Sequence, residues 1–256
     1  MRSDLQQQAT LRLLEMHFEA GVGHIGGNLS VLPLLLGLMH DVMSIDDRLV
    51  LSKGHAAGAL YVTLWTLGLL TDAELRTFHQ DGTLLAGHPP AAGLSGIEFA
   101  TGSLGHGLPM ACGLALGARL RNESRRIFCV TSDGEWNEGS MWEALIFAVH
   151  RQLDGLTVVV DVNGLQGFGR TRDVANLEPL AERFRVFGAA VLEVNGRWAA
   201  DLLGQISQAE QTGRPLVVLA RTTKGSGVSF MEDRMEWHYL PMTAEQYQQA
   251  VKEVGG

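Results

Sequence analysis

The sequence predicts an α/β fold with a mostly parallel central sheet and helices on both of its faces. Short, fully apolar runs alternate along the chain with stretches of helical periodicity, and this alternation is typical of βαβ units. The apolar runs lack the in-and-out pattern of half-exposed strands, as expected for strands that are covered on both faces. A length of 256 residues suits one large α/β domain, so we expect a single domain over residues 1-256.

Helices are expected to dominate the first part of the chain. Leucines recur at three- and four-residue spacings from Asp4 to Glu19, which predicts a first helix. A glycine-rich break from Gly21 to Ser30 precedes an apolar helix from about Val31 to His40. The run LVLSKGHAAGALYVTLWTLGLL is typical of strand, loop and helix, and a loop region follows from Gly82 to Thr101.

Strands and helices then alternate to the end of the chain. A helix of small residues is expected within 102–120, where glycine and alanine allow close packing. The expected strands lie at 126–133, 156–163, 189–194 and 215–220, and the expected helices at 138–151, 174–185, 199–212 and 243–254.

Composition excludes several functional classes. A hydrophobic content of 46% with 19% charged residues can bury a sizeable core, and a net charge of −8 argues against a nucleic-acid surface. Cys112 and Cys129 lie in apolar stretches without metal-binding spacing, so we expect buried free thiols. The start lacks the pattern of a secretory signal, and the longest nearly apolar run, from Gly58 to Leu70, is shorter than the ~20 residues of a membrane span. We therefore expect a cytoplasmic protein.

Polar residues follow two of the expected strands at the point where each strand ends. Asp133 and Gly134 follow the first, and Asn163 follows the next. Ligands of parallel sheets bind at this edge, and a helix that opens there can hold a diphosphate. Mg²⁺ prefers six oxygen ligands. We expect these from the Asp133 carboxylate, the Asn163 amide, the Leu165 carbonyl, two diphosphate oxygens and one water. Alternatively, the DG and NG dipeptides are simply turns that close strands.

Further motifs resemble a known family. The SDG motif with Asn163 thirty residues later resembles the GDG signature of thiamine-diphosphate enzymes. GHIGGNLS, DRLVLSKGHA, AGHPP, TGSLGHG and KGSGVSFMED with EWHY follow in the order of similar motifs in the N-terminal domain of transketolase. The resemblance spans almost the whole chain and implies the thiamine-diphosphate-binding fold, with thiamine diphosphate and Mg²⁺ as cofactors.

The resemblance also implies a set of site residues. His24 and His238 are expected near the diphosphate, and His55 and His88 beside the substrate, where an imidazole can donate to oxygen or move a proton. The remaining expected cofactor contacts are Gly102, Leu104, Gly105, Asp133, Gly134, Glu135 and Asn163.

The family pattern also implies a partner chain. The chain ends soon after His238, where transketolase continues into a pyrimidine-binding domain and a C-terminal domain. We therefore expect one subunit of a split enzyme, assembled as a dimer of heterodimers. It would transfer a two-carbon ketol unit from a ketose, in the form of a phosphate, to an aldose. Glu138 matches an acidic residue at the family's dimer interface, or it is a carboxylate that favours a helix N-terminus.

Departures from the family pattern leave other functions open. Ser132 replaces the first glycine of GDG, Ile25 replaces a proline, His106 replaces a glutamine and Tyr239 replaces a glycine. These changes bear on the choice of substrate. One alternative is a component of another thiamine-diphosphate enzyme, either 2-oxo-acid decarboxylating or similar to deoxyxylulose-phosphate synthase. The other is a non-catalytic domain that retains the fold.

Overall fold

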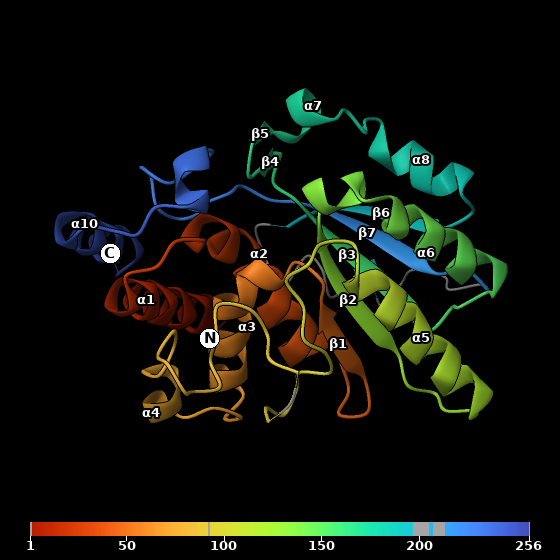
Figure 1. Ribbon diagram of the computed structural model, residues 1–256, viewed down its shortest axis with the longest axis horizontal. Helices are drawn as coiled ribbons and strands as arrows, with labels where there is room; N and C mark the ends of the chain where they lie inside the picture. Colours follow the sequence, from red (N-terminus) through yellow and green to blue (C-terminus); the bar gives the residue numbers. More distant parts are fainter. Residues whose placement is uncertain (1, 92, 197–204, 207–212, 256) are drawn as a thin grey trace.

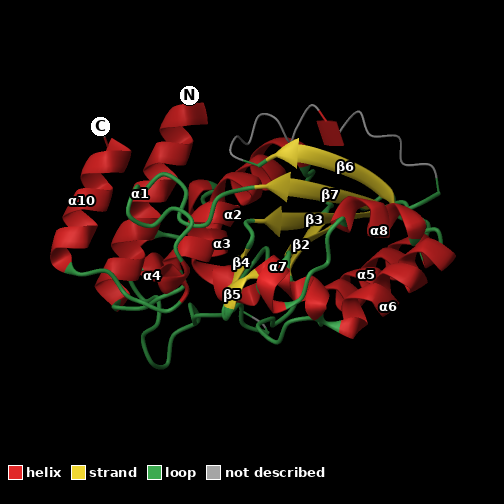
Figure 2. Cartoon of the chain, turned by 90° about the horizontal axis from the view of Figure 1, so that it is seen from above, coloured by secondary structure: helices red, strands yellow, loops and turns green. Residues whose placement is uncertain are grey.

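A parallel sheet forms the centre of the molecule. The computed structural model describes all residues except 1, 92, 197–204, 207–212 and 256. The sheet has five strands in the order β1-β2-β3-β7-β6, and every neighbouring pair is parallel. Figure 2 shows the arrowheads of β3, β6 and β7 pointing the same way. The strands span Arg48–Leu51 (β1), Ile127–Ser132 (β2), Leu156–Val162 (β3), Ala190–Asn195 (β6) and Leu216–Arg221 (β7). The predicted fold class is confirmed.

Helices cover both faces of this sheet (Figure 1). Alternate side chains of β2 enter two separate apolar cores, because Phe128 and Val130 belong to one and Ile127 and Cys129 to the other. The first core contains α1 (Arg2–Ala20), α2 (Ile25–Gly37), α3 (Ala57–Thr66) and part of α10 (Ala244–Gly255). The second contains α5 (Gly107–Leu120), α6 (Gly139–His150) and α8 (Leu180–Val186). Strands buried on both sides explain the fully apolar runs of the sequence.

The second helix begins earlier than predicted. We expected it to start near Val31, but α2 begins at Ile25 and a π-helical turn continues it over Leu38–Val42. A Cβ on Gly26 would lie 3.1 Å from the Trp237 Cβ and 3.2 Å from the Lys224 Cγ. The glycine-rich segment therefore packs closely against the end of the chain, and this contact outweighs the low helix propensity of glycine.

The predicted helix over 174–185 is wrong in its extent. The structure has a single turn, α7 (Thr171–Val174), and the separate helix α8, with Pro179 at the N-cap of α8. A proline disfavours helical geometry in the residue before it, so the chain cannot continue as one helix. The predicted helix over 199–212 lies outside the described residues except for 205 and 206.

The smaller elements complete the chain. A short antiparallel hairpin, β4 (Leu165–Gln166) and β5 (Gly169–Arg170), follows β3 and was not predicted. The other short helical turns are η2 (Gly54–Ala56), α4 (Asp72–Leu75), η3 (Gly134–Asn137) and η4 (Met235–His238).

Two expectations from composition can be compared with the structure. Cys112 and Cys129 are buried and free, as predicted. Among the described residues, the stretch Ile25–Val42 is long and apolar enough to cross a membrane, although 83% of it is buried inside the protein. That burial is typical of a core helix of a soluble protein.

Candidate active site

The carboxyl-terminal edge of the sheet brings Asp133 and Asn163 together. Asp133 follows β2, and its carboxylate accepts hydrogen bonds from the N–H groups of Gly134 and Gly164, each at 2.8 Å. The Thr171 hydroxyl donates to the same carboxylate at 3.1 Å. Gly164 directly follows Asn163, so the two predicted residues lie at one edge, as expected for neighbouring parallel strands.

The surroundings of Asp133 suit a cation with oxygen ligands. Burial raises the pKa of Asp133 to about 6, and the negative charge of Asp161 acts in the same direction. The Asn163 Oδ1 atom accepts from the Leu165 N–H at 3.1 Å, which ties the residue to the start of β4. No three His, Cys, Asp or Glu side chains form a metal cluster in the described part of the chain. One carboxylate with amide and carbonyl oxygens fits the coordination preference of Mg²⁺. Phosphate and water oxygens supply its remaining ligands.

Four histidines converge beside this edge. The ring centroid of His24 lies 5.2 Å from that of His238, 5.7 Å from that of His55 and 6.3 Å from that of His88. The rings of His55 and His238 are 5.5 Å apart. The four residues come from widely separated segments, so only the tertiary fold assembles this histidine cluster.

Burial favours the neutral form of the histidine cluster, in which His88 is the most exposed member. It is the first cause that lowers the pKa of His24, His55 and His88. It also lowers the pKa of His238 to about 3, and the positive charge of Lys224 adds to this effect. Neutral imidazoles can each donate one hydrogen bond and accept another. The cluster can therefore bind polar oxygen atoms without carrying charge.

Lys224 is a site residue that the sequence reasoning missed. Its Nζ atom lies 2.9 Å from the His238 Nδ1 atom. Burial lowers the pKa of Lys224 to about 8, and the positive charge of Lys53 lowers it further. The sequence did contain a sign of its role, because the family-like motif KGSGVSFMED begins with this lysine. A buried cation beside neutral histidines is suited to an anionic ligand.

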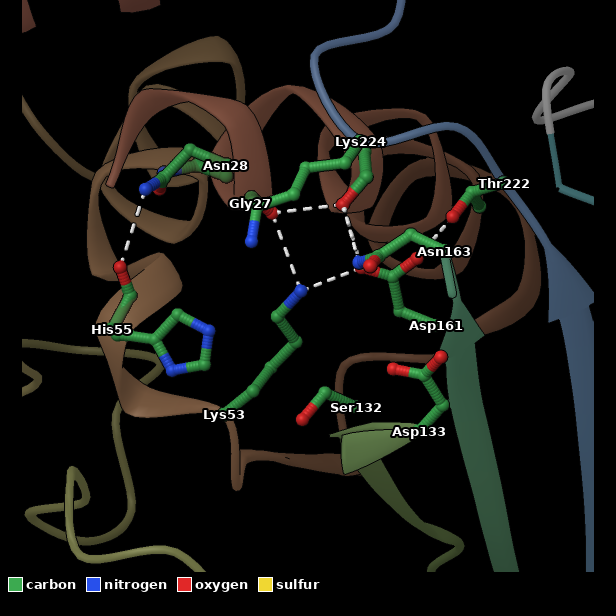
Figure 3. Close-up of polar contacts among 12 residues, drawn as sticks. Gly27, Asn28, Lys53, His55, Ser132, Asp133, Asp161, Asn163, Thr222 and Lys224 are labelled. Atoms are coloured by element: carbon green, nitrogen blue, oxygen red, sulfur yellow. Dashed lines mark hydrogen bonds and ion pairs between the residues drawn. The ribbon is translucent and has the colours of Figure 1, made fainter. Parts of the chain in front are cut away.

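A second missed feature is a buried ion pair beneath the site. The Lys53 Nζ atom lies 2.5 Å from the Asp161 Oδ2 atom, and both side chains are completely buried. Figure 3 shows Lys53 reaching between Gly27 and Asp161. The hydroxyls of Ser30 and Thr222 also donate to Asp161. This Asp161 network joins α2, the end of β1, β3 and the end of β7.

Glu135 does not face an open site. It is completely buried, and its Oε1 atom accepts from the Ser52 hydroxyl at 2.6 Å and the Gly105 N–H at 3.0 Å. It therefore holds the loop before α5 in place. In that loop a Cβ on Gly102 would lie 2.7 Å from the His88 ring, so glycine permits the histidine to approach. Leu104 is half-buried in the same loop.

The departures from the family pattern occupy different surroundings. The Ser132 hydroxyl accepts from the Glu135 N–H at 3.3 Å, and Ile25 is fully buried at the start of α2. His106 is exposed at the N-cap of α5.

Glu138, which matches the family pattern, is the exposed N-cap residue of α6, and its side chain makes no capping hydrogen bond.

Comparisons with known proteins show the family of this chain. The family described as transketolase, thiamine diphosphate binding domain, matches residues 5–256. The chain belongs to this family. It is 40% identical to one of the apulose-4-phosphate transketolase subunits, from Phocaeicola vulgatus, over 95% of this chain and 90% of that protein. It is 38% identical to a 6-deoxy-6-sulfo-D-fructose transketolase subunit of a Clostridium species, over 98% of this chain and 96% of that protein.

Solved transketolases share the fold. The structure of transketolase from Campylobacter jejuni superimposes with a TM-score of 0.88 at 31% identity, over 98% of this chain and 42% of that one. The chain thus spans less than half of a full-length transketolase but nearly the whole of the separate subunits. It is an N-terminal transketolase subunit of the kind that carries the thiamine diphosphate binding domain.

Proposed function

We propose that this chain forms the thiamine-diphosphate and Mg²⁺ half of a two-chain transketolase that transfers a two-carbon ketol unit from a ketose to an aldose. The observation that carries the proposal is the meeting of the histidine cluster and Lys224 with the sheet edge that bears Asp133 and Asn163. Neither group alone would require this reaction. Together they offer a place for a metal, a diphosphate and a polar substrate.

The metal and the diphosphate have separate sets of residues. Asp133, Asn163 and the Leu165 carbonyl would hold Mg²⁺. Lys224 and the neighbouring His238 would bind the diphosphate, because a buried cation and neutral donors suit an anion. The further expected contacts are His24, His55, Gly102, Leu104, Gly105 and Gly134. Glu135 acts through the loop that it positions rather than by direct contact.

The residues of this chain orient the substrate and stabilise charge. When bound, thiamine diphosphate supplies the nucleophilic carbon and the electron sink for cleaving and forming the carbon–carbon bond. His55 and His88 would donate hydrogen bonds to substrate oxygens that gain negative charge, and His24 would fix their orientation. A neutral imidazole has one donor and one acceptor nitrogen, so each of these rings can also relay a proton between substrate oxygens.

The names of the relatives support a proposal for the assembly and the substrates. Two of them are named as separate transketolase subunits. We therefore propose a single domain over 1-256, a second subunit with the pyrimidine-binding and C-terminal domains, and a dimer of such pairs in the cytoplasm. One relative is named for a sugar phosphate and the other for a sulfonated sugar. An anionic ketose is the substrate class that we propose here, within carbohydrate metabolism.

The variant Asp133→Asn tests the metal assignment. It keeps the size of the side chain and one of its two acceptor oxygens but removes its charge, so we expect Mg²⁺-dependent binding of thiamine diphosphate to weaken at least about 10-fold. Calorimetric titration of cofactor at several Mg²⁺ concentrations measures this. The control is Asp173→Asn, which changes an exposed carboxylate on α7. Wild-type binding in Asp133→Asn would remove Asp133 from the metal site.

A further inference from the structure

The hairpin β4–β5 is too small to hold its own shape. It has two residue pairs, Leu165 with Arg170 and Gln166 with Gly169. A two-stranded hairpin is marginally stable by itself in water, so contacts with the rest of the protein must fix it. Its first residue is Leu165, whose carbonyl we have proposed as a Mg²⁺ ligand. The contacts that anchor the hairpin therefore affect the position of a proposed metal ligand.

Tyr239 anchors the tip of this hairpin. The Tyr239 hydroxyl donates a hydrogen bond of 2.7 Å to the Gly167 carbonyl, which lies 72 residues earlier in the chain. A Cβ on Gly167 would lie 2.6 Å from the same hydroxyl oxygen, so the contact leaves no room for a side chain. Further tertiary contacts are the ion pair of Arg170 with Asp233, in which both side chains are about half-exposed, and a 3.3 Å hydrogen bond that the Asn137 amide donates to the Gln166 Oε1 atom. The ion pair and the tyrosine contact are both partly exposed, and Tyr239 itself is 53% exposed. The tyrosine differs from the other contacts because its ring also packs on His238.

The backbone around Tyr239 is fixed to the histidine cluster. The Tyr239 ring packs edge-to-face on the His238 ring, with centroids 4.7 Å apart. The His24 N–H donates to the His238 carbonyl at 3.2 Å. A Cβ on Gly23 would lie 2.3 Å from the Tyr239 carbonyl oxygen, so the segment before α2 also packs tightly here. Tyr239 thus connects the hairpin to two of the four clustered histidines.

We propose that Tyr239 is a positioning residue whose hydroxyl fixes the β4–β5 hairpin against the histidine cluster and so preorganises Asn163 and Leu165 for Mg²⁺. The proposal rests on the proposed function. Tyr239 does not touch the metal ligands itself. It acts through Gly167, two residues after Leu165, and the Asn163 side chain bonds to the Leu165 N–H. A fixed hairpin spares the cofactor the cost of ordering these ligands on binding.

Hydrogen exchange of the variant Tyr239→Phe tests the anchor without any cofactor. The variant loses only the hydroxyl and keeps the ring on His238. We expect amides of residues 164–171 to exchange about 3- to 10-fold faster, as the loss of one hydrogen bond implies. The matched control is Tyr247→Phe, because Tyr247 stacks on Phe18 with a centroid distance of 4.4 Å on the helical layer of α1 and α10. Equal exchange in Tyr239→Phe and the wild type would overturn the proposal.

The consequence for the metal has its own measurement. With the chain purified from its own cells together with any bound second subunit, tryptophan fluorescence follows thiamine diphosphate binding during a Mg²⁺ titration. We expect Tyr239→Phe to raise the half-saturating Mg²⁺ concentration about 3- to 10-fold with an unchanged melting temperature. If the wild type does not respond to cofactor and Mg²⁺, the proposed function fails. If the wild type responds and the variant has the same half-saturating Mg²⁺ concentration, only this inference fails.

A double-mutant cycle separates the contact from general damage. The substitution Gly167→Ala places a methyl group against the hydroxyl in the wild type. In Tyr239→Phe the hydroxyl is gone, and the next atoms lie at 3.6 and 3.7 Å, an ordinary contact distance. We expect Gly167→Ala to accelerate exchange of residues 164–171 in the wild type and to add little in Tyr239→Phe. Additive effects would show that the two residues act separately and would contradict the proposal.

Discussion

At the scale of single residues, the Asp161 network is the feature that most constrains the site. Lys53 and Asp161 are fully buried, and each charge is compensated mainly by the other. Isolated buried charges are very costly, so such a pair persists only with good geometry and additional hydrogen bonds. Ser30 and Thr222 supply these bonds to Asp161. The pair therefore fixes the relative positions of the segments that carry His55 and Asn163.

The substitution Lys53→Met is expected to be strongly destabilising. It leaves the Asp161 carboxylate buried without its counter-charge, which costs about 3–5 kcal/mol in the free energy of unfolding. Urea denaturation measures this loss, and the double variant Lys53→Met with Asp161→Asn should recover part of it. The control Arg170→Met breaks a half-exposed ion pair and should cost at most ~1 kcal/mol. A similar small effect for Lys53→Met would show that the pair is not essential.

At the scale of elements, the contact between α1 and α3 depends on a histidine and a glycine. A Cβ on Gly58 would lie 2.4 Å from the His17 Cε1 atom, so the glycine lets the ring pack directly on α3. The His17 Nδ1–H donates to the Leu13 carbonyl at 3.1 Å. The ring is 1% exposed, and burial lowers the pKa of His17 to about 4. The helix pair is thus held together by a histidine that must stay neutral.

This burial predicts acid sensitivity. In the unfolded chain, His17 regains a pKa near its ordinary value of 6.5, so between pH 6.5 and about 4 the unfolded state binds more protons than the folded state. The contribution of His17 to stability is complete above pH 6.5 and declines as the pH falls through this window, by ~3 kcal/mol in total. Urea denaturation between pH 4.5 and 7.5 should show a shallower pH dependence for His17→Gln than for the wild type. The exposed residue His150 provides the control variant His150→Gln, and parallel curves for all three proteins would contradict the assignment.

At the scale of the whole molecule, the chain presents one part of a larger catalytic unit. It covers 42% of a full-length transketolase and 96% of a separate subunit in the Clostridium relative. We propose that the histidine cluster, Lys224 and Asp133 hold a metal and a diphosphate. The family pattern assigns the activation of the aminopyrimidine ring to a different domain, which we propose lies in the second subunit.

The expected partner can be detected directly. Native mass spectrometry of the tagged chain, purified with Mg²⁺ from its own cells, should show two copies of this chain with two copies of a second protein. Ketol transfer should require both kinds of chain, because the proposed second subunit completes the site. Efficient transfer by this chain alone would contradict the split-enzyme proposal. Consumption of pyruvate with release of CO₂ by the complex would instead indicate a decarboxylating relative.

The sequence by itself determined the fold class, the strands of the parallel sheet and the meeting of Asp133 with Asn163. Those features depend on local periodicity and on the rule that parallel strands end at one edge, so short segments of the sequence are enough to predict them. Two helix boundaries were not predicted correctly. Contacts with Lys224 and Trp237 decide where α2 starts, and the position of Pro179 decides the division between α7 and α8.

Only the tertiary structure decided which distant residues meet. Lys53 and Asp161 lie 108 residues apart in the chain, and the Tyr239 hydroxyl reaches Gly167 across 72 residues. Nothing in the local pattern around Lys53 and Asp161 distinguishes a buried partner from a solvated surface group, and nothing around Tyr239 indicates a contact with Gly167. The physical reason is that burial and close packing depend on the whole fold, while propensity and periodicity act over only a few turns of chain.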